Sequence, residues 1–386
     1  MTRPGPIVIV GAGAAGLSTA LQLAERGCRD VTVIDRAHVA AGSSGVSVGI
    51  YTRQYTDPLD IRLRVECYER LCALEREAGL TLIRNGFLRL AHDEASLEIF
   101  EEGARRQHEL GVPDARALDR DELKRLVPDM RCDDLAGGLF GPSDGYLDGQ
   151  QLCMTYAERA EALGVRVLAR RALVGYEEGG ARRHRLFTTG ETLECDVVIN
   201  AAGAWAPAVG DILGAPVEIV AERHQACIMH FSEPLPYRLP SVMDYVPGSG
   251  RLGLYFRPEG ERQLIVGLHS NDRLEEGADP DAFHRGADAA FMEELIPMLI
   301  DRMPRFDGVG LQDGWAGLYP NSSDERFIIG PMPGREGVFA ACGLDGVGVY
   351  TSPAVGRMAA DWVLDGAPAA LEEAERFAPY RLTVKR

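Results

Sequence analysis

Three glycines near the N-terminus are spaced as a phosphate-binding turn. They belong to the run GAGAAG at residues 11–16, which directly follows the apolar stretch Ile7–Val10. Gly11 allows a tight turn out of a strand, Gly13 lets the backbone approach a pyrophosphate, and Gly16 lets a helix pack closely on the strand. The spacing therefore predicts a dinucleotide site at a strand-to-helix turn.

An acidic residue follows at the distance that a ribose requires. Asp35 lies 19 residues after Gly16, at the end of a second apolar run. A carboxylate there accepts hydrogen bonds from ribose hydroxyls and repels a 2′-phosphate, which disfavours NADP. Ala14 and Ala15 would begin the helix whose positive end faces the phosphates, and Arg36 would lie beside the ribose.

A second small-residue loop favours FAD over NAD. The glycine pattern continues to Ala20 and Gly27, a longer form that is typical of FAD-binding units. The loop at residues 42–45 then offers small side chains and backbone N–H groups to the phosphates and ribityl chain. Its residues are Gly42, Ser43, Ser44 and Gly45. A plain flexible loop would be the interpretation if this segment stood alone.

The elements that must hold these residues alternate in type along the chain. Strand, glycine turn, helix and strand form one βαβ unit over residues 7–34, and a similar texture returns after residue 337. Residues 216–270 instead alternate as antiparallel strands do. We therefore expect a mixed α/β and α+β fold with a Rossmann-like FAD-binding domain and an inserted antiparallel-sheet substrate domain. The predicted FAD-binding domain comprises residues 1–85, 142–215 and 318–386, and the predicted substrate domain comprises residues 86–141 and 216–317.

Composition excludes several classes of partner. The formal net charge is -17, so phosphate backbones would be repelled and nucleic acid is not expected as a partner. Lysine plus arginine number 41, of which only Lys124 and Lys385 are lysines. No run reaches the roughly 20 apolar residues of a membrane span. The eight scattered cysteines show no metal-ligand spacing and indicate reduced thiols in the cytoplasm.

Seven motifs in order resemble one flavoprotein family across nearly the whole chain. The sequence resembles the D-amino-acid oxidase (DAO) superfamily, on its sarcosine oxidase and dimethylglycine dehydrogenase side. This resemblance implies a GR2-type FAD-binding domain with the flavin ring at the domain boundary. The motifs are GAGAAGLSTALQLAERG, AGSSGVSVGIYTRQ, GYLDGQQL, DVVINAAGAWA, LYFRPEG, WAGLYPNSSDERFIIGPMP and GVFAACGLDGVGVYTSPAVG.

The resemblance also implies further contacts to FAD. Leu173 would touch the adenine through its backbone, and Ala202, Gly203 and Trp205 would line the dinucleotide channel. A second helix N-terminus would face the flavin pyrimidine, where reduced flavin carries negative charge. The residues expected there are Gly346, Val347, Gly348, Val349 and Tyr350.

Five residues are candidates to act on the substrate, and three of them match positions that do so in this family. Arg53 in YTRQ matches an arginine that holds the substrate carboxylate, although a surface arginine is the competing interpretation. His269 in VGLH matches an active-site histidine that could assist loss of the amine proton. Tyr319 in GLYP matches a tyrosine that faces the flavin. Tyr255 and Arg257 lie two residues apart and so share a strand face, where a core tyrosine with an edge arginine is equally compatible.

Two departures from the family pattern change the expected chemistry. The position of the flavin-linking cysteine of monomeric sarcosine oxidases is Gly317. The flavin-linking histidine of dimethylglycine dehydrogenases, expected near the serine loop, has no match either, so we expect non-covalent FAD. The position of the oxygen-activating lysine is Ile265. The electron acceptor is therefore O2 or another molecule.

Three functions follow, in order of preference. The first is an FAD-dependent oxidoreductase that oxidises the C–N bond of an amino acid or N-alkyl amine to an imine. The second is an FAD-dependent 2-hydroxy-acid dehydrogenase, because SSGVSVGIY resembles that neighbouring family. The third is a non-catalytic flavoprotein assembly factor. We expect no metal, and a monomer or homo-oligomer.

Overall fold

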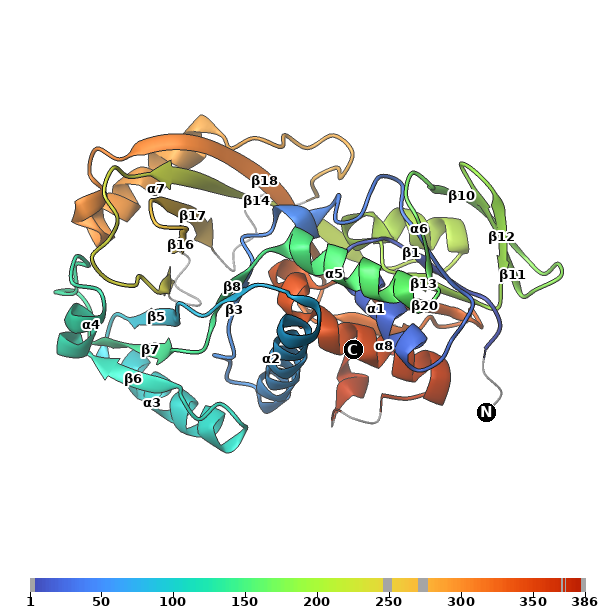
Figure 1. Cartoon of the computed structure of the whole chain (residues 1–386), viewed down its shortest axis with the longest axis horizontal. Helices are drawn as coiled ribbons and strands as arrows, with labels where there is room; N and C mark the ends of the chain where they lie inside the picture. The colour runs from blue at the N-terminus through green and yellow to red at the C-terminus, as the bar shows by residue number, and fades with distance from the viewer. Residues whose placement is uncertain (1–3, 246–251, 270–276, 369–370, 372, 383–386) are drawn as a thin grey trace.

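Two large sheets organise the molecule (Figure 1). The computed structural model describes residues 4–245, 252–269, 277–368, 371 and 373–382. A six-stranded sheet with its helices occupies the right of the view, and an eight-stranded sheet occupies the left. The fold class predicted from the sequence is confirmed.

The six-stranded sheet has the order β19-β20-β13-β1-β2-β9 and is parallel except at β19. Central strands of such a sheet are buried on both faces, which explains their unbroken runs of valine and isoleucine. The strands are β1 (Ile7–Val10), β2 (Val31–Ile34), β9 (Arg166–Leu168), β13 (Val197–Asn200), β19 (Ile328–Pro331) and β20 (Val338–Cys342).

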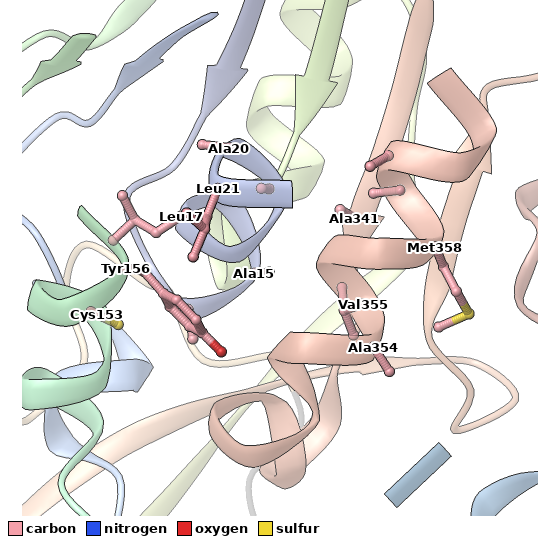
Figure 2. Close-up of a cluster of buried hydrophobic side chains, with 14 of the residues drawn as sticks. Ala15, Leu17, Ala20, Leu21, Cys153, Tyr156, Ala341, Ala354, Val355 and Met358 are labelled. Carbon is pink, nitrogen blue, oxygen red and sulfur yellow. The ribbon is translucent and has the colours of Figure 1, made fainter. Parts of the chain in front are cut away.

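Helices α1 (Ala14–Glu25), α5 (Gly149–Ala162) and α8 (Gly348–Asp365) cover one face of this sheet. Figure 2 shows side chains of the three helices in this buried cluster, with Tyr156 of α5 beside Leu17 of α1. A Cβ at Gly356 would lie 2.4 Å from Ser18 Oγ, so glycine lets α1 and α8 approach closely. The long helix α2 (Pro58–Ala78) packs along α8.

The other face is covered by α6 (Ala206–Leu213) and a three-stranded sheet. That sheet consists of β10 (Leu173–Glu178), β11 (His184–Thr188) and β12 (Thr192–Cys195). A small sheet near the middle of the molecule joins β3 (Ile50–Tyr51), β8 (Gly145–Leu147) and β4 (Leu82–Ile83).

The eight-stranded sheet has the order β18-β14-β17-β16-β15-β5-β7-β6. One face packs on α4 (Arg120–Leu126) and α7 (Ala289–Arg302), and α3 (Glu94–Glu109) covers its outer strands. All pairings are antiparallel except β15 with β5. The strands are β5 (Phe87–Ala91), β6 (Arg116–Asp119), β7 (Gly137–Gly141), β14 (Ile219–His230), β15 (Ser241–Asp244), β16 (Gly253–Glu259), β17 (Gln263–His269) and β18 (Gly310–Ser322).

Two segments differ from what the sequence pattern predicts. The apolar pattern of residues 82–91 predicts one continuous strand, but the structure interrupts it at Gly86, whose φ is +90° and whose Cβ would meet the Phe140 ring at 2.5 Å. The pattern of residues 146–163 predicts one helix, but the helix begins only at Gly149, because residues 145–147 form β8 and Asp148 caps the helix.

The predicted domain boundaries remain a prediction. The eight-stranded sheet draws its strands from residues 87–141 and 219–322. The boundary predicted at residue 317 falls inside β18, which continues to Ser322. Among the described residues, no helix is long and apolar enough to cross a membrane.

Candidate active site

A cavity of about 620 Å³ runs from the glycine turn to the exposed face of the eight-stranded sheet. Both sheets contribute to its walls. It brings together 18 of the residues predicted from the sequence: Gly11, Gly13, Ala14, Ala15, Asp35, Arg36, Gly42, Ser43, Ser44, Leu173, Ala202, Gly203, Trp205, Tyr255, Tyr319, Gly346, Gly348 and Val349. The other predicted residues, namely Gly16, Gly45, Arg53, Arg257, His269, Val347 and Tyr350, are not among its lining residues.

The glycine turn leaves no room for side chains where backbone segments meet. Gly11 has a φ of +118°, and a Cβ there would lie 2.4 Å from the Ala201 carbonyl oxygen. A Cβ at Gly16 would lie 2.0 Å from the Gly11 carbonyl oxygen. At Gly13 the nearest atom would be Ser44 Oγ at 3.2 Å, so this glycine keeps space open beside the cavity.

The start of α1 offers backbone donors to the cavity. Gly13 is its N-cap and makes no side-chain capping hydrogen bond. The Ala14 N–H donates to Ser44 Oγ at 3.1 Å, which joins the helix to the serine loop. Uncapped N–H groups at a helix N-terminus attract anions such as phosphate.

Asp35 is held in place by backbone donors. Its Oδ2 accepts from the Ala12 N–H and its Oδ1 from the Ala37 N–H, both at 2.8 Å. The carboxylate is thus fixed at the end of β2 and lines the cavity.

An interaction between the two parts of the molecule encloses the same end of the cavity. The Trp205 indole N–H donates to Asp281 Oδ1 at 2.9 Å, and Arg36 Nη1 lies 2.7 Å from the same oxygen. The Arg36 guanidinium also lies over the Trp205 ring, 5.5 Å from its centroid. Asp281 therefore tethers the segment before α7 to the nucleotide side.

The start of α8 meets the cavity near the eight-stranded sheet. The helix has no side-chain cap, and a 3₁₀ turn over Asp345–Val347 precedes it. Asp345 has a φ of +53°, and burial raises the pKa of its carboxyl group. A Cβ at Gly346 would lie 2.4 Å from the Tyr319 ring, so glycine is required where this turn contacts β18.

Aromatic side chains form the wall on the eight-stranded sheet. The rings of Tyr319 and His224 stack with centroids 3.8 Å apart, and His224 Nε2 lies 3.2 Å from Glu222 Oε2. Tyr255 lies across Gly267, where a Cβ would meet its hydroxyl at 2.2 Å. Burial raises the pKa of both tyrosines, which keeps their phenols protonated.

Arg53 is paired with carboxylates of its own chain. Its Nε donates to Asp144 Oδ1 at 2.9 Å, and its Nη2 lies 3.4 Å from Asp114 Oδ1. The guanidinium lies 4.3 Å from the centroid of the Tyr68 ring, and only 5% of the residue is exposed. These partners occupy the groups with which Arg53 was expected to bind a substrate carboxylate.

The side chains of Arg257 and Tyr350 are likewise bonded to other groups of the protein. Arg257 donates to the Val48 carbonyl at 2.6 Å, pairs with Glu259 and lies over the Tyr146 ring. Tyr350 accepts from Arg64 Nε at 2.7 Å. Since Val48 lines the cavity, Arg257 fixes a wall residue from behind.

His269 lies at the end of β17, where its ring contacts Tyr245 edge-on with centroids 4.9 Å apart. Burial, with smaller contributions from His224 and the charge of Arg89, lowers the pKa of His269 to about 4. Its imidazole is therefore neutral at ordinary pH.

Several lining residues were not found from the sequence. His224, Gln225, Trp315, Asp281 and Arg285 all border the cavity. Four consecutive polar residues, Glu222 to Gln225, interrupt the apolar residues of β14, and this run was the available signal. Within the described residues there is no group of three or more histidine, cysteine or acidic side chains that could hold a metal ion.

The profile of the DAO family, described as FAD dependent oxidoreductase, matches residues 6–362. This chain belongs to that family. Human mitochondrial sarcosine dehydrogenase is 27% identical over 383 residues, covering 95% of this chain and 41% of that protein. Glycine oxidase from Geobacillus kaustophilus (strain HTA426) is 25% identical over 398 residues, covering 99% of this chain and 98% of that protein. The chain thus spans about two fifths of the length of the sarcosine dehydrogenase.

A solved structure shows the same fold. The structure of L-proline dehydrogenase from P. horikoshii superposes with a TM-score of 0.86 and 24% identity, covering 99% of each chain. The cofactor of this family is FAD. The residues here suit it, because two uncapped helix N-termini, a ribose-binding carboxylate and a glycine turn line one continuous cavity.

Proposed function

We propose that this family member oxidises the C–N bond of an amino acid or N-alkyl amine. The observation that carries the proposal is the single cavity that joins the glycine turn to the aromatic face around Tyr255 and Tyr319. A substrate on that face would meet the reactive end of an extended FAD. The names of the relatives, which state sarcosine and glycine, support the same class of substrate.

The proposed FAD contacts follow the cavity from end to end. Asp35 would bind the ribose, and the start of α1 with Ser44 would bind the pyrophosphate. The start of α8 would face the pyrimidine edge of the flavin, where its partial positive charge stabilises the negative charge of the reduced form. FAD, when bound, supplies an acceptor for the hydrogen and electron pair leaving the carbon beside nitrogen.

The chain itself would position the substrate and exclude water. The aromatic wall of Tyr255, Tyr319 and His224, in which Tyr255 is buried, provides a surface that excludes water and against which an amine can be held. His269 is neutral, so it can accept a proton but cannot supply a fixed charge. The imine product would hydrolyse in water after release.

Two residues of the sheet bear on how FAD is attached and on which molecule accepts its electrons. Position 317 is glycine and lines the cavity, so we propose that FAD is held without a covalent bond there. Ile265 occupies the strand position where the resemblance places an oxygen-activating lysine, and its side chain is buried. We therefore propose an acceptor other than O2 as the faster one.

We propose a cytoplasmic monomer or homo-oligomer. All eight cysteines are free thiols, which suits a reducing compartment. Sedimentation of the purified holoprotein at several concentrations would give the oligomeric state.

The reaction is tested by anaerobic mixing of the holoprotein with two panels of compounds. Loss of the flavin absorbance with N-methyl amino acids, together with release of a carbonyl product, is the expected result. Bleaching by 2-hydroxy acids alone would instead establish the hydroxy-acid dehydrogenase. If neither panel bleaches the flavin, the enzyme proposal fails and the assembly-factor interpretation replaces it.

A further inference from the structure

A row of directly paired residues crosses the eight-stranded sheet and ends on an arginine. Gly267 pairs with Tyr255, Tyr255 with Met243, and Met243 with Arg89. Residues that oppose each other in neighbouring strands project to the same face of a sheet. Arg89 therefore stands on the face that carries Tyr255, the tyrosine that lines the cavity.

The opposite face of the same strands confirms this direction. Leu88 and Leu90 flank Arg89 and are buried in the hydrophobic core on the far side of the sheet, with Val242 and Phe256. Because side chains alternate along a strand, Arg89 must point away from that core. Two strand spacings, about 10 Å between backbones, separate Arg89 from Tyr255, and Met243 projects to the same face between them.

Within the part of the chain that the structure describes, Arg89 has no carboxylate partner, unlike Arg53 and Arg257. Among the described residues it forms no ion pair, and its Nε is buried without a hydrogen-bond partner. Its aromatic neighbour is the Phe87 ring, 5.5 Å from the guanidinium carbon to the centroid. Arg53 and Arg257, in contrast, are both paired with acidic side chains.

A partly buried guanidinium without an anion is unfavourable, since charge is poorly solvated there. The neighbouring His269 is neutral and its pKa is lowered in part by the charge of Arg89, so this residue does not compensate it. A ligand carboxylate would satisfy the arginine with two parallel N–H···O hydrogen bonds.

We propose that Arg89, and not Arg53, binds the carboxylate of the substrate. The inference rests on the proposed function and narrows it, because plain amines lack the group that Arg89 requires. Of the two substrates in the proposed function, an amino acid or an N-alkyl amine, this selects the amino acid. Its carboxylate would be held at Arg89 and its nitrogen would lie toward Tyr255 and the flavin site.

The test compares a carboxylate with its neutral amide. Holoprotein is titrated with pyrrole-2-carboxylate and with pyrrole-2-carboxamide, and the perturbation of the flavin spectrum gives each Kd without turnover. In Arg89→Gln, carboxylate binding is expected to weaken about 10- to 100-fold while amide binding stays within about twofold. Arg89→Lys keeps the charge but not the planar fork, and should lose less than Arg89→Gln.

Arg116→Gln is the matched control. Arg116 also lies on a strand of this sheet with a phenylalanine ring 5.5 Å from its guanidinium carbon, but it pairs with Phe140 of the opposite core. The Arg116→Gln variant should bind both probes with the wild-type Kd. Flavin content and far-ultraviolet circular dichroism check that each variant is folded, and Arg89→Lys carries the test if Arg89→Gln does not retain flavin.

Two results would overturn the assignment. One is unchanged carboxylate binding in the Arg89 variants. The other is an equal loss for carboxylate and amide, which indicates a structural role. Failure of the proposed reaction would give a different result. The wild-type protein would then still bind the carboxylate more tightly than the amide through Arg89, but no amino acid would bleach its flavin.

Discussion

Nearly all cationic side chains of this chain are arginines. They differ in role because the fold gives them different partners. Arg53 has the buried acceptor Asp144, and Arg257 has Glu259 and the Val48 carbonyl. Arg89 has no such acceptor among the described residues. Identical side chains therefore divide into those whose charge is paired within the protein and those whose charge a ligand can still pair.

Replacing Asp144 should destabilise the protein strongly. Its buried carboxylate accepts from Thr52 Oγ1, from the Arg53 N–H and from Arg53 Nε. Asp144→Asn leaves the Arg53 charge without its closest partner, and losing one member of a buried pair costs about 3–5 kcal/mol. Urea unfolding of the holoprotein measures this loss.

Asp114→Asn is the control for that experiment. Asp114 is 3.4 Å from Arg53 and its side chain is 27% exposed, so its removal should cost less than about 1 kcal/mol. Equal losses for the two variants would show that the Arg53–Asp144 pair is not the stabilising contact.

His269 should make stability fall with acidity. Its folded pKa of about 4 lies below the unfolded value of about 6.5, because burial disfavours the charged ring. The unfolded state then binds the proton first, so stability present at pH 7 declines as the pH falls from about 6.5 to 4. His269→Gln should lack this component.

Unfolding free energies of the wild type and His269→Gln at pH 8, 6, 5 and 4.5 provide the measurement. The difference between them should shift in favour of the variant as the pH falls, by at most about 3 kcal/mol. A difference that is constant with pH would mean that His269 is protonated equally readily in the folded and unfolded states.

At the scale of elements, the faces of strands and the ends of helices decide what reaches the cavity. In strands β16 and β17, successive residues alternate between the hydrophobic core and the sheet face that carries Tyr255. Helices α1 and α8 both begin at the cavity without side-chain caps. The site is thus built from one sheet face and two helix N-termini.

The junction of β1 and α1 should not tolerate a side chain at Gly16. In Gly16→Ala the new Cβ would lie 2.0 Å from the Gly11 carbonyl oxygen, so the phosphate-binding turn must move. We expect the purified variant to lose most of its flavin absorbance relative to its protein absorbance, and to lose more than about 2 kcal/mol of stability.

Gly79→Ala provides a comparison with backbone strain alone. Gly79 ends α2 with a φ of +72°, and no other group lies within 4 Å of the point that a Cβ would occupy. It should cost about 1–2 kcal/mol and leave the flavin content unchanged. Normal flavin content in Gly16→Ala would contradict the steric argument.

At the scale of the whole molecule, the cavity lies where the two sheets meet, so FAD would contact both parts. A ligand that binds only the folded state stabilises it, by about 2.7 kcal/mol at a hundred times its Kd. Removal of FAD should therefore lower the thermal midpoint, and added FAD should restore it in a concentration-dependent way.

Acid precipitation tests the proposed non-covalent attachment in the same preparation. We expect the yellow colour to stay in the supernatant and the pellet to be colourless. A yellow pellet after washing would establish a covalent bond and exclude the proposed mode of attachment.

Local patterns sufficed to predict the nucleotide half of the protein. The glycine turn, Asp35 and the flanking strands are neighbours in sequence, and their chemistry depends on backbone geometry that glycine and β-branched residues impose locally. The alternating pattern of residues 216–270 predicted the second sheet, and the order of motifs predicted the family, which the family profile confirmed.

Only the tertiary structure decided which polar side chains face the cavity. Arg53 and Asp144 lie 91 residues apart, and their ion pair is invisible in the sequence. Arg89 and Tyr255 share a face only because β15 pairs with β5 in parallel, in a register set by long-range packing. A motif specifies a residue type, whereas the availability of its charge depends on which distant acid the fold brings beside it.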